Sequence, residues 1–220
     1  MRVQTLNKPS SVVTRKTFTD YLRLWFKWVL DPLGRFFNRL GLTPNMVTVI
    51  GMIGNCIGAY YLAQGDMFIG GLWVLIMTPV DALDGTMARL RGEPGDFGAF
   101  VDSVSDRYSE LIIYGGLLYH FLFIGEPLGG MLTFIAAAGS VLVSYVKARA
   151  EGLGYGAKVG LLTRVERYIV LAPSLVFNKL YLGLAIIAIF ANITALQRIW
   201  HVRAQAHVRM RTAIPEEKKL

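Results

Sequence analysis

The chain has 220 residues, 54% of them hydrophobic, and its mean hydropathy is positive. This composition excludes an ordinary soluble domain. Once loops and ends are subtracted, the length allows about six membrane-spanning helices of roughly 20 residues each. No room is then left for a second, soluble domain. The formal net charge of +8 is no sign of nucleic-acid binding, because the basic residues gather at the ends of apolar segments and in both termini, as in a membrane protein whose basic side faces the cytoplasm.

Two different parts precede the expected spans. Residues 1–16 are polar and basic, and we expect a mobile N-terminus without the apolar core of a signal peptide. In residues 17–42, aromatic and aliphatic side chains recur at helical spacing together with several lysines and arginines. This mixture predicts an amphipathic helix that lies on an anionic membrane surface. A first transmembrane helix is the alternative, and the cations count against it.

Apolar segments then recur along residues 43–202 and predict an all-α integral membrane domain of six transmembrane helices, followed by a basic cytoplasmic tail at 203–220. Thr43 is suited to cap the first span, with Pro44 at its first helical position. Pro79 should kink the second span, because proline has no backbone donor. The six spans are expected at about residues 46–63, 67–89, 97–123, 128–150, 161–177 and 181–200.

The distribution of basic residues predicts the orientation of these spans. The turns at 64–66, 125–127 and 178–179 contain one cation, Lys179, whereas the other 22 of the 23 lysines and arginines lie at the opposite ends or in the termini. Both termini should therefore face the cytoplasm. The remaining polar and charged segments between spans then meet on the same cytoplasmic face.

Five aspartates lie close together in the stretch DALDGTMARLRGEPGDFGAFVDSVSD. Asp81 and Asp84 are three residues apart and Asp102 and Asp106 are four apart, so each pair lies on one helix face. A polar break at 91–95 can turn one helix back against the next. Each carboxylate turned toward the bilayer interior costs about 2.5 to 3.5 kcal/mol. The cluster therefore requires divalent cations, protons or basic partners to neutralise it.

Small residues accompany the aspartates. Gly85 and Gly98 leave space near the carboxylates for a second helix or a substrate, and Ala88 keeps the same face narrow. Arg89 can bind a phosphate or balance a carboxylate. Two divalent cations held by the four carboxylates could clamp a pyrophosphate while an alkoxide forms.

The same stretch fits the pattern D-x2-D-G-x2-A-R-x8-G-x3-D-x3-D and resembles the signature of the CDP-alcohol phosphatidyltransferases. A TPN segment at 43–45 also resembles the one that precedes the first span in many members. The matching positions are Asp81, Asp84, Gly85, Ala88, Arg89, Gly98, Asp102 and Asp106.

This resemblance implies six transmembrane helices in a homodimer, and transfer of a phosphatidyl group from a CDP-lipid such as CDP-diacylglycerol to a hydroxyl, with release of CMP. It implies two Mg²⁺ or Mn²⁺ ions, with Asp106 shared between metal binding and general base. The implied metal ligands are Asp81, Asp84, Asp102 and Asp106. The implied CDP-lipid-binding residues are Asn45, Asp84, Gly85, Ala88, Arg89 and Gly98.

Three segments outside the signature bear on the acceptor. SYVKARAE, the segment 164–167 and Gln197-Arg198 resemble the phosphatidylinositol-phosphate synthase branch of actinobacteria and a similar archaeal branch. This implies that Lys147, Arg167 and Arg198 bind the phosphate of inositol 1-phosphate, at the cytoplasmic face of a prokaryotic plasma membrane. A dianionic acceptor also needs a basic cluster beside the acidic site. The chain has Val165 where that branch often has proline.

Alternatives stay open at this point. Glycerol 3-phosphate is another phosphorylated acceptor, so a basic pocket does not exclude it. A divalent-cation or proton-coupled transporter would also contain intramembrane carboxylates, although these are expected near the midplane. Two neighbours of the acidic cluster are expected to have ordinary partners: Arg107 should pair with one of the acids, and Glu110 should form a buried hydrogen bond to a neighbouring helix.

Overall fold

The computed structural model describes the backbone of residues 18–92 and 95–213 and the side chains of 28–92 and 95–211. The segment 1–16 and the last residues of the tail, for which we made predictions, lie outside this range. Within it the chain is all-helical, as predicted, with no strand. The helices are α1 (Phe18–Arg39), α2 (Pro44–Gln64), α3 (Met67–Asp81), α4 (Leu83–Arg91), α5 (Asp96–Phe123), α6 (Pro127–Gly152), α7 (Arg164–Val176) and α8 (Leu180–Ala213).

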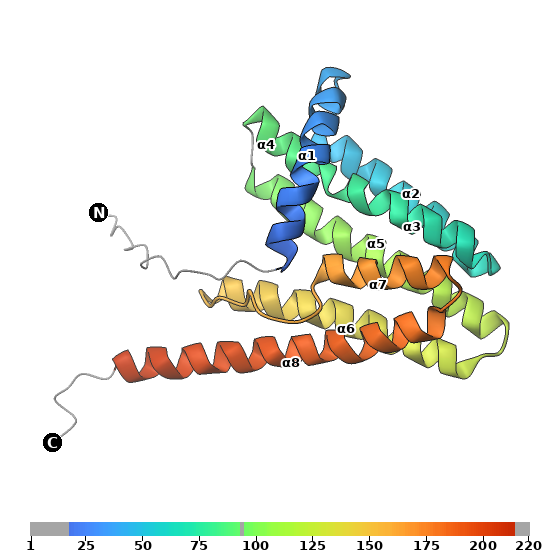
Figure 1. Cartoon of the computed structure of the whole chain (residues 1–220). Coiled ribbons are helices and arrows are strands. Elements are labelled where there is room, and N and C mark those ends of the chain that lie inside the picture. The colour runs from blue at the N-terminus through green and yellow to red at the C-terminus, as the bar shows by residue number, and fades with distance from the viewer. Residues whose placement is uncertain (1–17, 93–94, 214–220) are drawn as a thin grey trace.

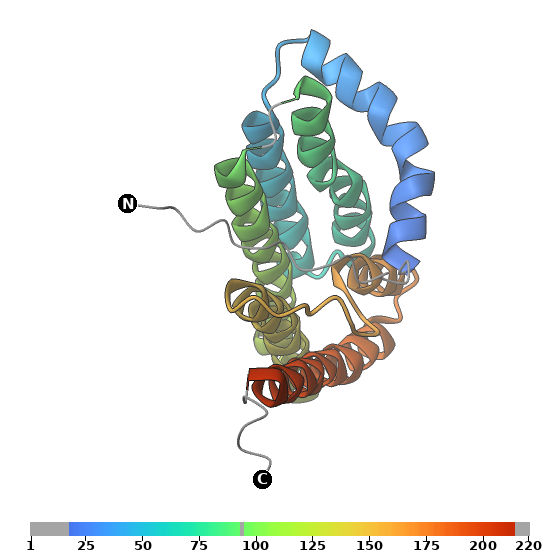
Figure 2. The same ribbon diagram turned by 90° about the vertical axis from the view of Figure 1, so that its left-hand side faces the viewer.

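Helix α1 differs from the others in its direction. Figure 1 shows it crossing the bundle steeply, and Figure 2 shows it on the outside, next to α4. Leu30 is buried against α4, and Gly34 allows close contact because a Cβ there would lie 3.1 Å from a methyl of Leu90. Trp28 and Phe36 are exposed. The helix therefore has one face on the protein and an uncovered aromatic face.

The start of α2 confirms the predicted cap. Thr43 Oγ1 accepts a hydrogen bond from the backbone N–H of Met46 at 3.3 Å, and Pro44 occupies the first turn. Helix α2 ends at Gly65, whose φ of 91° is available to glycine without strain. Local chemistry thus fixes both ends of this helix.

The second predicted span is two helices. Pro79 lies inside α3, but the interruption comes three residues later, at Ala82, where the backbone N–H bonds to the Pro79 carbonyl oxygen at 3.1 Å. This tight turn separates Asp81, at the end of α3, from Asp84, in the first turn of α4. The break therefore falls inside the acidic signature.

Four helical stretches are long and apolar enough to cross a membrane: Pro44–Gln64, Met67–Arg91, Pro127–Gly152 and Leu180–Arg211. Helix α5 falls outside this group, and its first half carries several charged residues. Helix α7 has 13 residues, or about 20 Å at 1.5 Å per residue, which is short of a hydrocarbon core of about 30 Å.

The last two helices differ in length from the predicted segments. Helix α7 begins at Arg164 rather than near 161, because the chain is irregular up to that point and Gly160 has a φ of 130°. Helix α8 continues to Ala213, so helical structure passes residue 202, where the expected membrane domain ends.

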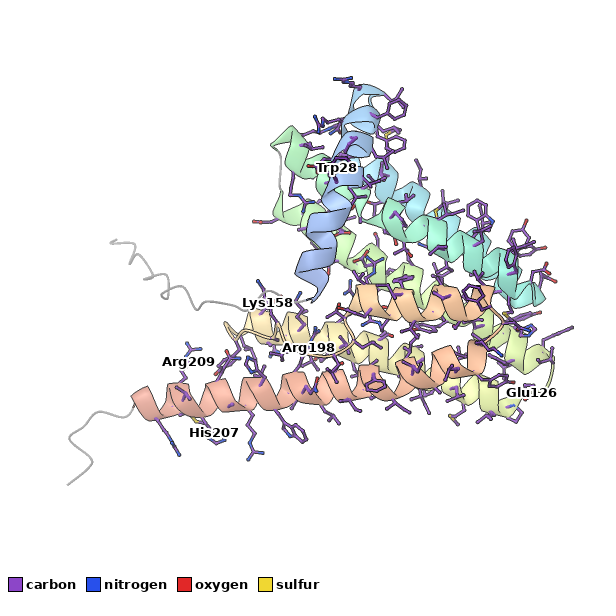
Figure 3. All side chains as sticks on the ribbon, in the orientation of Figure 1. Trp28, Glu126, Lys158, Arg198, His207 and Arg209 are labelled. Atoms are coloured by element: carbon purple, nitrogen blue, oxygen red, sulfur yellow. The ribbon has the colours of Figure 1, made fainter. Side chains whose placement is uncertain are left out.

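The bundle has two unlike ends. The turns between α2 and α3, α5 and α6, and α7 and α8 lie together at the right-hand end in Figure 1, and Figure 3 shows Glu126 there. Lys158, His207 and Arg209 lie toward the opposite end (Figure 3). Between the ends, α2 packs on α3 and α5, and α6 packs on α8. The core that joins α3, α5, α7 and α8 includes Val74, Leu117, Leu175 and Leu184.

Candidate active site

The first two aspartates of the signature are buried at the junction of α3 and α4. Asp81 is 9% exposed and Asp84 is 4% exposed. The backbone N–H of Gly85 donates to Asp84 Oδ1. Because charged groups are expensive to bury, both carboxylates need further partners.

Helix α2 supplies polar partners that sequence reasoning missed. Thr48 Oγ1 donates to Asp84 Oδ2 at 2.6 Å, and Asn55 Nδ2 donates to Asp81 Oδ2 at 3.5 Å. Between them, Gly51 has no side chain, and a Cβ there would lie 2.5 Å from Asp81 Oδ1. The signal was available in the sequence, because these three residues share one helix face at spacings of three and four within an apolar segment.

Helix α5 contributes Asp102 and Asp106, one turn apart. Asp102 is half-buried, and the side chain of Asp106 is 15% exposed. Arg107 Nη1 donates to Asp106 Oδ2 at 3.2 Å, which confirms the expected pairing of Arg107 with an acid of the cluster.

Arg164, the first residue of α7, joins the two halves of the acidic cluster. Its Nη2 donates to Asp81 Oδ2 at 2.8 Å, and its Nη1 forms an ion pair with Asp106 Oδ1. The guanidinium also lies over the ring of Tyr168, 5.3 Å from the centroid. A single cation therefore bridges carboxylates from α3 and α5.

This arrangement bears directly on whether the cluster can hold a metal. Among the residues that the structure describes, no three histidine, cysteine, aspartate or glutamate side chains are close enough together to do so as they stand. The guanidinium of Arg164 occupies the position between Asp81 and Asp106. The donor set nevertheless fits a hard divalent cation, because it consists of carboxylate oxygens and two of them already share one cationic group.

The residues expected to bind the CDP-lipid are small, or polar and exposed. A Cβ added to Gly85 or Gly98 would meet nothing within 4 Å. Asn45 is exposed in the first turn of α2, and Ala88 is half-buried on α4. Arg89 is exposed, and its Nη2 donates to Thr86 Oγ1 at 2.9 Å. Both glycines therefore leave their backbone open to an approaching ligand.

Helix α4, which carries most of these residues, is fastened to α1. Asn38 Oδ1 accepts from Arg91 Nε at 2.7 Å, and Asn38 Nδ2 donates to the Met87 carbonyl oxygen at 3.3 Å. Arg91 Nη2 also donates to the carbonyl oxygen of Leu42, just before α2. The surface helix α1 thus helps to fix the position of α4.

Arg167 does not lie open to solvent. It is 1% exposed and donates from Nε and Nη2 to the two carboxylate oxygens of Glu110, at 2.7 and 2.9 Å. Its Nη1 donates to the Leu162 carbonyl oxygen at 3.3 Å. This bidentate pair confirms the prediction that Glu110 makes a buried hydrogen bond to a neighbouring helix.

The other two residues expected at the acceptor site have different partners. Arg198, labelled in Figure 3, donates to the backbone carbonyl oxygens of Val159 and Val143 at 2.9 and 2.6 Å. Lys147 is half-exposed, with Nζ 3.9 Å from Glu151 Oε1. Arg167 and Arg198 are thus held inside the protein, whereas Lys147 reaches solvent.

Comparison with known proteins gives consistent results. A family model described as CDP-alcohol phosphatidyltransferase matches residues 41–207. An archaetidylinositol phosphate synthase of Pyrococcus horikoshii is 33% identical over 182 residues, which cover 80% of this chain and 92% of the relative. A phosphatidylinositol phosphate synthase of Mycobacterium tuberculosis H37Rv is 34% identical over 205 residues, covering 88% of this chain and 94% of the relative.

Solved structures of a similar protein share the fold. A crystal structure of M. tuberculosis phosphatidylinositol phosphate synthase with CDP-DAG bound superposes with a TM-score of 0.73 at 33% identity, covering 79% of this chain and 93% of that one. A second structure of the same synthase, in complex with manganese and citrate, gives a TM-score of 0.71 at 33% identity, covering 79% and 88%.

Proposed function

We infer that this chain, which belongs to the CDP-alcohol phosphatidyltransferase family, transfers a phosphatidyl-type group from a CDP-lipid to a hydroxyl of inositol 1-phosphate and releases CMP. The observation that carries this inference is the acidic cluster on α3, α4 and α5, whose four aspartates occupy the four acidic positions of the family signature. Membership of this family favours an enzyme over the alternative of a cation- or proton-coupled transporter.

The proposed metal ligands are the four aspartates of the cluster. Bound Mg²⁺ or Mn²⁺ would neutralise the pyrophosphate and make CMP a better leaving group. Support comes from the all-oxygen donor set and from the similar synthase whose structure contains manganese. Thr48 and Asn55 orient the carboxylates of Asp84 and Asp81 by donating to one oxygen of each.

We propose Asp106 as the general base that takes the proton from the attacking hydroxyl. Its carboxylate is more exposed than those of Asp81 and Asp84, and it lies toward α7. Asn45, Gly85, Ala88, Arg89 and Gly98 are proposed to bind the cytidine diphosphate. The open space beside both glycines supports this assignment, because bare backbone lets a ligand approach closely.

For the acceptor phosphate we propose Lys147, Arg167 and Arg198. Basic side chains suit a dianion, and the relatives named as inositol-phosphate lipid synthases support the choice of acceptor. Because Arg167 is paired with Glu110, binding there requires the guanidinium to share its donors between that carboxylate and the phosphate.

The proposed membrane arrangement has six membrane helices in a homodimer, formed by α2, the α3–α4 pair, α5, α6, α7 and α8, of which α7 by itself covers about two thirds of the hydrocarbon thickness. Helix α1 would lie on the membrane surface with its aromatic face in the lipid. The near absence of cations at the end with the three short turns supports a cytoplasmic location for the opposite end, and we place the active site and both termini on that side.

An acceptor screen tests this proposal. Purified protein in lipid nanodiscs would receive CDP-diacylglycerol and Mg²⁺ with inositol 1-phosphate, inositol or glycerol 3-phosphate, and CMP release would be measured. We expect release with inositol 1-phosphate and little with the other two. Release with glycerol 3-phosphate alone would overturn the acceptor, and no release with any alcohol would overturn the reaction.

A further inference from the structure

Arg164 occupies a position that the reaction proposed above does not explain. Its two terminal nitrogens contact Asp81 Oδ2 on α3 and Asp106 Oδ1 on α5. Both carboxylates are proposed metal ligands. A divalent cation that used these same oxygens would meet the guanidinium there. Metal and guanidinium would therefore compete for Asp81 Oδ2 and Asp106 Oδ1.

The charges of the described residues explain why a cation is needed there without metal. Asp81 is 9% exposed and Asp106 is 15% exposed, so neither carboxylate is well hydrated. Two ionised carboxylates facing each other in such surroundings repel strongly. Arg107 touches Asp106 from the rim, where its side chain is 30% exposed, and Arg164 is the partner that reaches both.

Two unsatisfied groups distinguish Arg164 from an ordinary structural arginine. Among the residues that the structure describes, its Nε and the hydroxyl of Tyr168 are both buried without a well-formed hydrogen bond, although the hydroxyl lies close enough to the guanidinium to interact with it. Arg167, one turn further along α7, has Nε, Nη1 and Nη2 all bonded. A buried donor without a partner costs free energy, so the position of Arg164 is less fully stabilised than that of Arg167. This is the pattern expected of a side chain that can be displaced.

We propose that Arg164 is an internal counter-ion of the metal site, which holds Asp81 and Asp106 together without metal and is displaced when a divalent cation binds. The proposal rests on the metal-dependent function proposed above. It makes Arg164 a positioning residue that sets metal affinity. The guanidinium keeps Asp81 and Asp106 close together without metal. Because it also competes for their oxygens, it raises the metal concentration needed to occupy them.

Metal binding to the full chain, measured without substrates, tests the proposal. Mn²⁺ affinity would be measured by electron paramagnetic resonance for wild type, R164Q and R107Q in nanodiscs. Removing a competing charge-assisted contact is expected to lower the Kd of R164Q by about tenfold. R107Q is the matched control, because it removes a cation that touches Asp106 and not Asp81, and it should change the Kd less. An unchanged or weaker affinity in R164Q would overturn the proposal.

A second measurement separates competition from misfolding. In EDTA, R164Q should melt below wild type, and saturating Mn²⁺ should reduce that difference. In wild type labelled with ¹⁵N-arginine, the Nε–H signal that disappears in R164K should shift on saturation with Mg²⁺. A signal that does not move while Mg²⁺ binds refutes displacement and leaves the proposed reaction intact. CMP release that survives full metal removal would instead refute the metal requirement, and this inference with it.

Discussion

The buried pair of Glu110 and Arg167 gives a sharp prediction about stability. Glu110 is replaced by leucine, which has a similar size and no charge. The side chains of Arg167 and Glu110 are 1% and 6% exposed, and their two hydrogen bonds measure 2.7 and 2.9 Å. After the replacement the guanidinium keeps one described partner, the Leu162 carbonyl oxygen at 3.3 Å.

Removing one member of a buried pair typically costs about 3–5 kcal/mol, because an uncompensated charge stays buried. For a chain of this size, about 1 kcal/mol corresponds to a change of roughly 2–4 °C in Tm, so Glu110→Leu should lower Tm by about 6–20 °C. The exposed residue Glu151, whose carboxylate lies 3.9 Å from Lys147 Nζ, provides the control. Glu151→Gln should change Tm little, since exposed pairs contribute about 0–1 kcal/mol.

Thermal unfolding in the same detergent or nanodisc, followed by near-UV circular dichroism, measures these differences. The double replacement Glu110→Leu with Arg167→Met should melt above the single variant, because no unpaired charge remains. The reasoning is refuted if Glu110→Leu melts within about 2 °C of wild type, or if the double variant is as unstable as the single one.

Four further substitutions test the active site and the contact that supports it. Gly85→Ala should leave Tm unchanged, since its Cβ meets nothing within 4 Å, and lower CMP release by about tenfold or more by occupying the CDP-lipid space. In Gly51→Ala the new Cβ would lie 2.5 Å from the buried carboxylate oxygen of Asp81, so this variant should lower both Tm and CMP release. An equal Tm for Gly51→Ala and Gly85→Ala would contradict the close approach of α2 to Asp81. Asp106→Asn should reduce CMP release by about 10²- to 10⁴-fold, and full activity would exclude the general base. Asn38→Ala removes two hydrogen bonds between α1 and α4. This variant should raise the KM for CDP-diacylglycerol but not the KM for inositol 1-phosphate. Equal changes in the two KM values would argue against a local effect on α4.

The features that could be predicted from the sequence are those that depend on residues close together along the chain. Apolar runs and turn residues determined the bounds of α2, α5 and α6 to within a few residues, and Thr43 with Pro44 gave the start of α2. The kink was predicted at Pro79, whereas the helix breaks three residues later, at Ala82. Proline weakens the helix at the hydrogen bond that it cannot donate, but the chain breaks where the backbone closes a tight turn. The extension of α8 to Ala213 was missed because its polar residues lack the apolar character by which the span was recognised.

The acidic cluster followed from spacing alone, but its partners did not. Two carboxylates three or four residues apart can be recognised from the sequence of a single helix. The hydrogen bonds from Thr48 and Asn55, by contrast, depend on how α2 packs against α3 and α4. The contacts of Arg164 are of the same kind, since they join residues 83 and 58 positions apart (164 − 81 and 164 − 106). Pairings at such distances are set by tertiary packing: the sequence shows that Thr48, Gly51 and Asn55 share one helix face, but it does not show which carboxylates that face contacts.

The contacts of α5 and α7 explain how one arginine can be released without loosening the site. Arg164 and Arg167 are three residues apart on α7, and their partners Asp106 and Glu110 are four apart on α5, so the two helices are joined by two successive ion pairs. Of these, the pair with Glu110 is bidentate and almost fully buried, while the other includes an arginine with an unsatisfied Nε. Metal binding that displaces Arg164 would therefore leave α7 anchored through Arg167. It follows that Glu110→Leu should weaken the binding of Mn²⁺ as well as lower Tm, because no ion pair would then remain between Arg164 or Arg167 and α5 when the metal displaces Arg164.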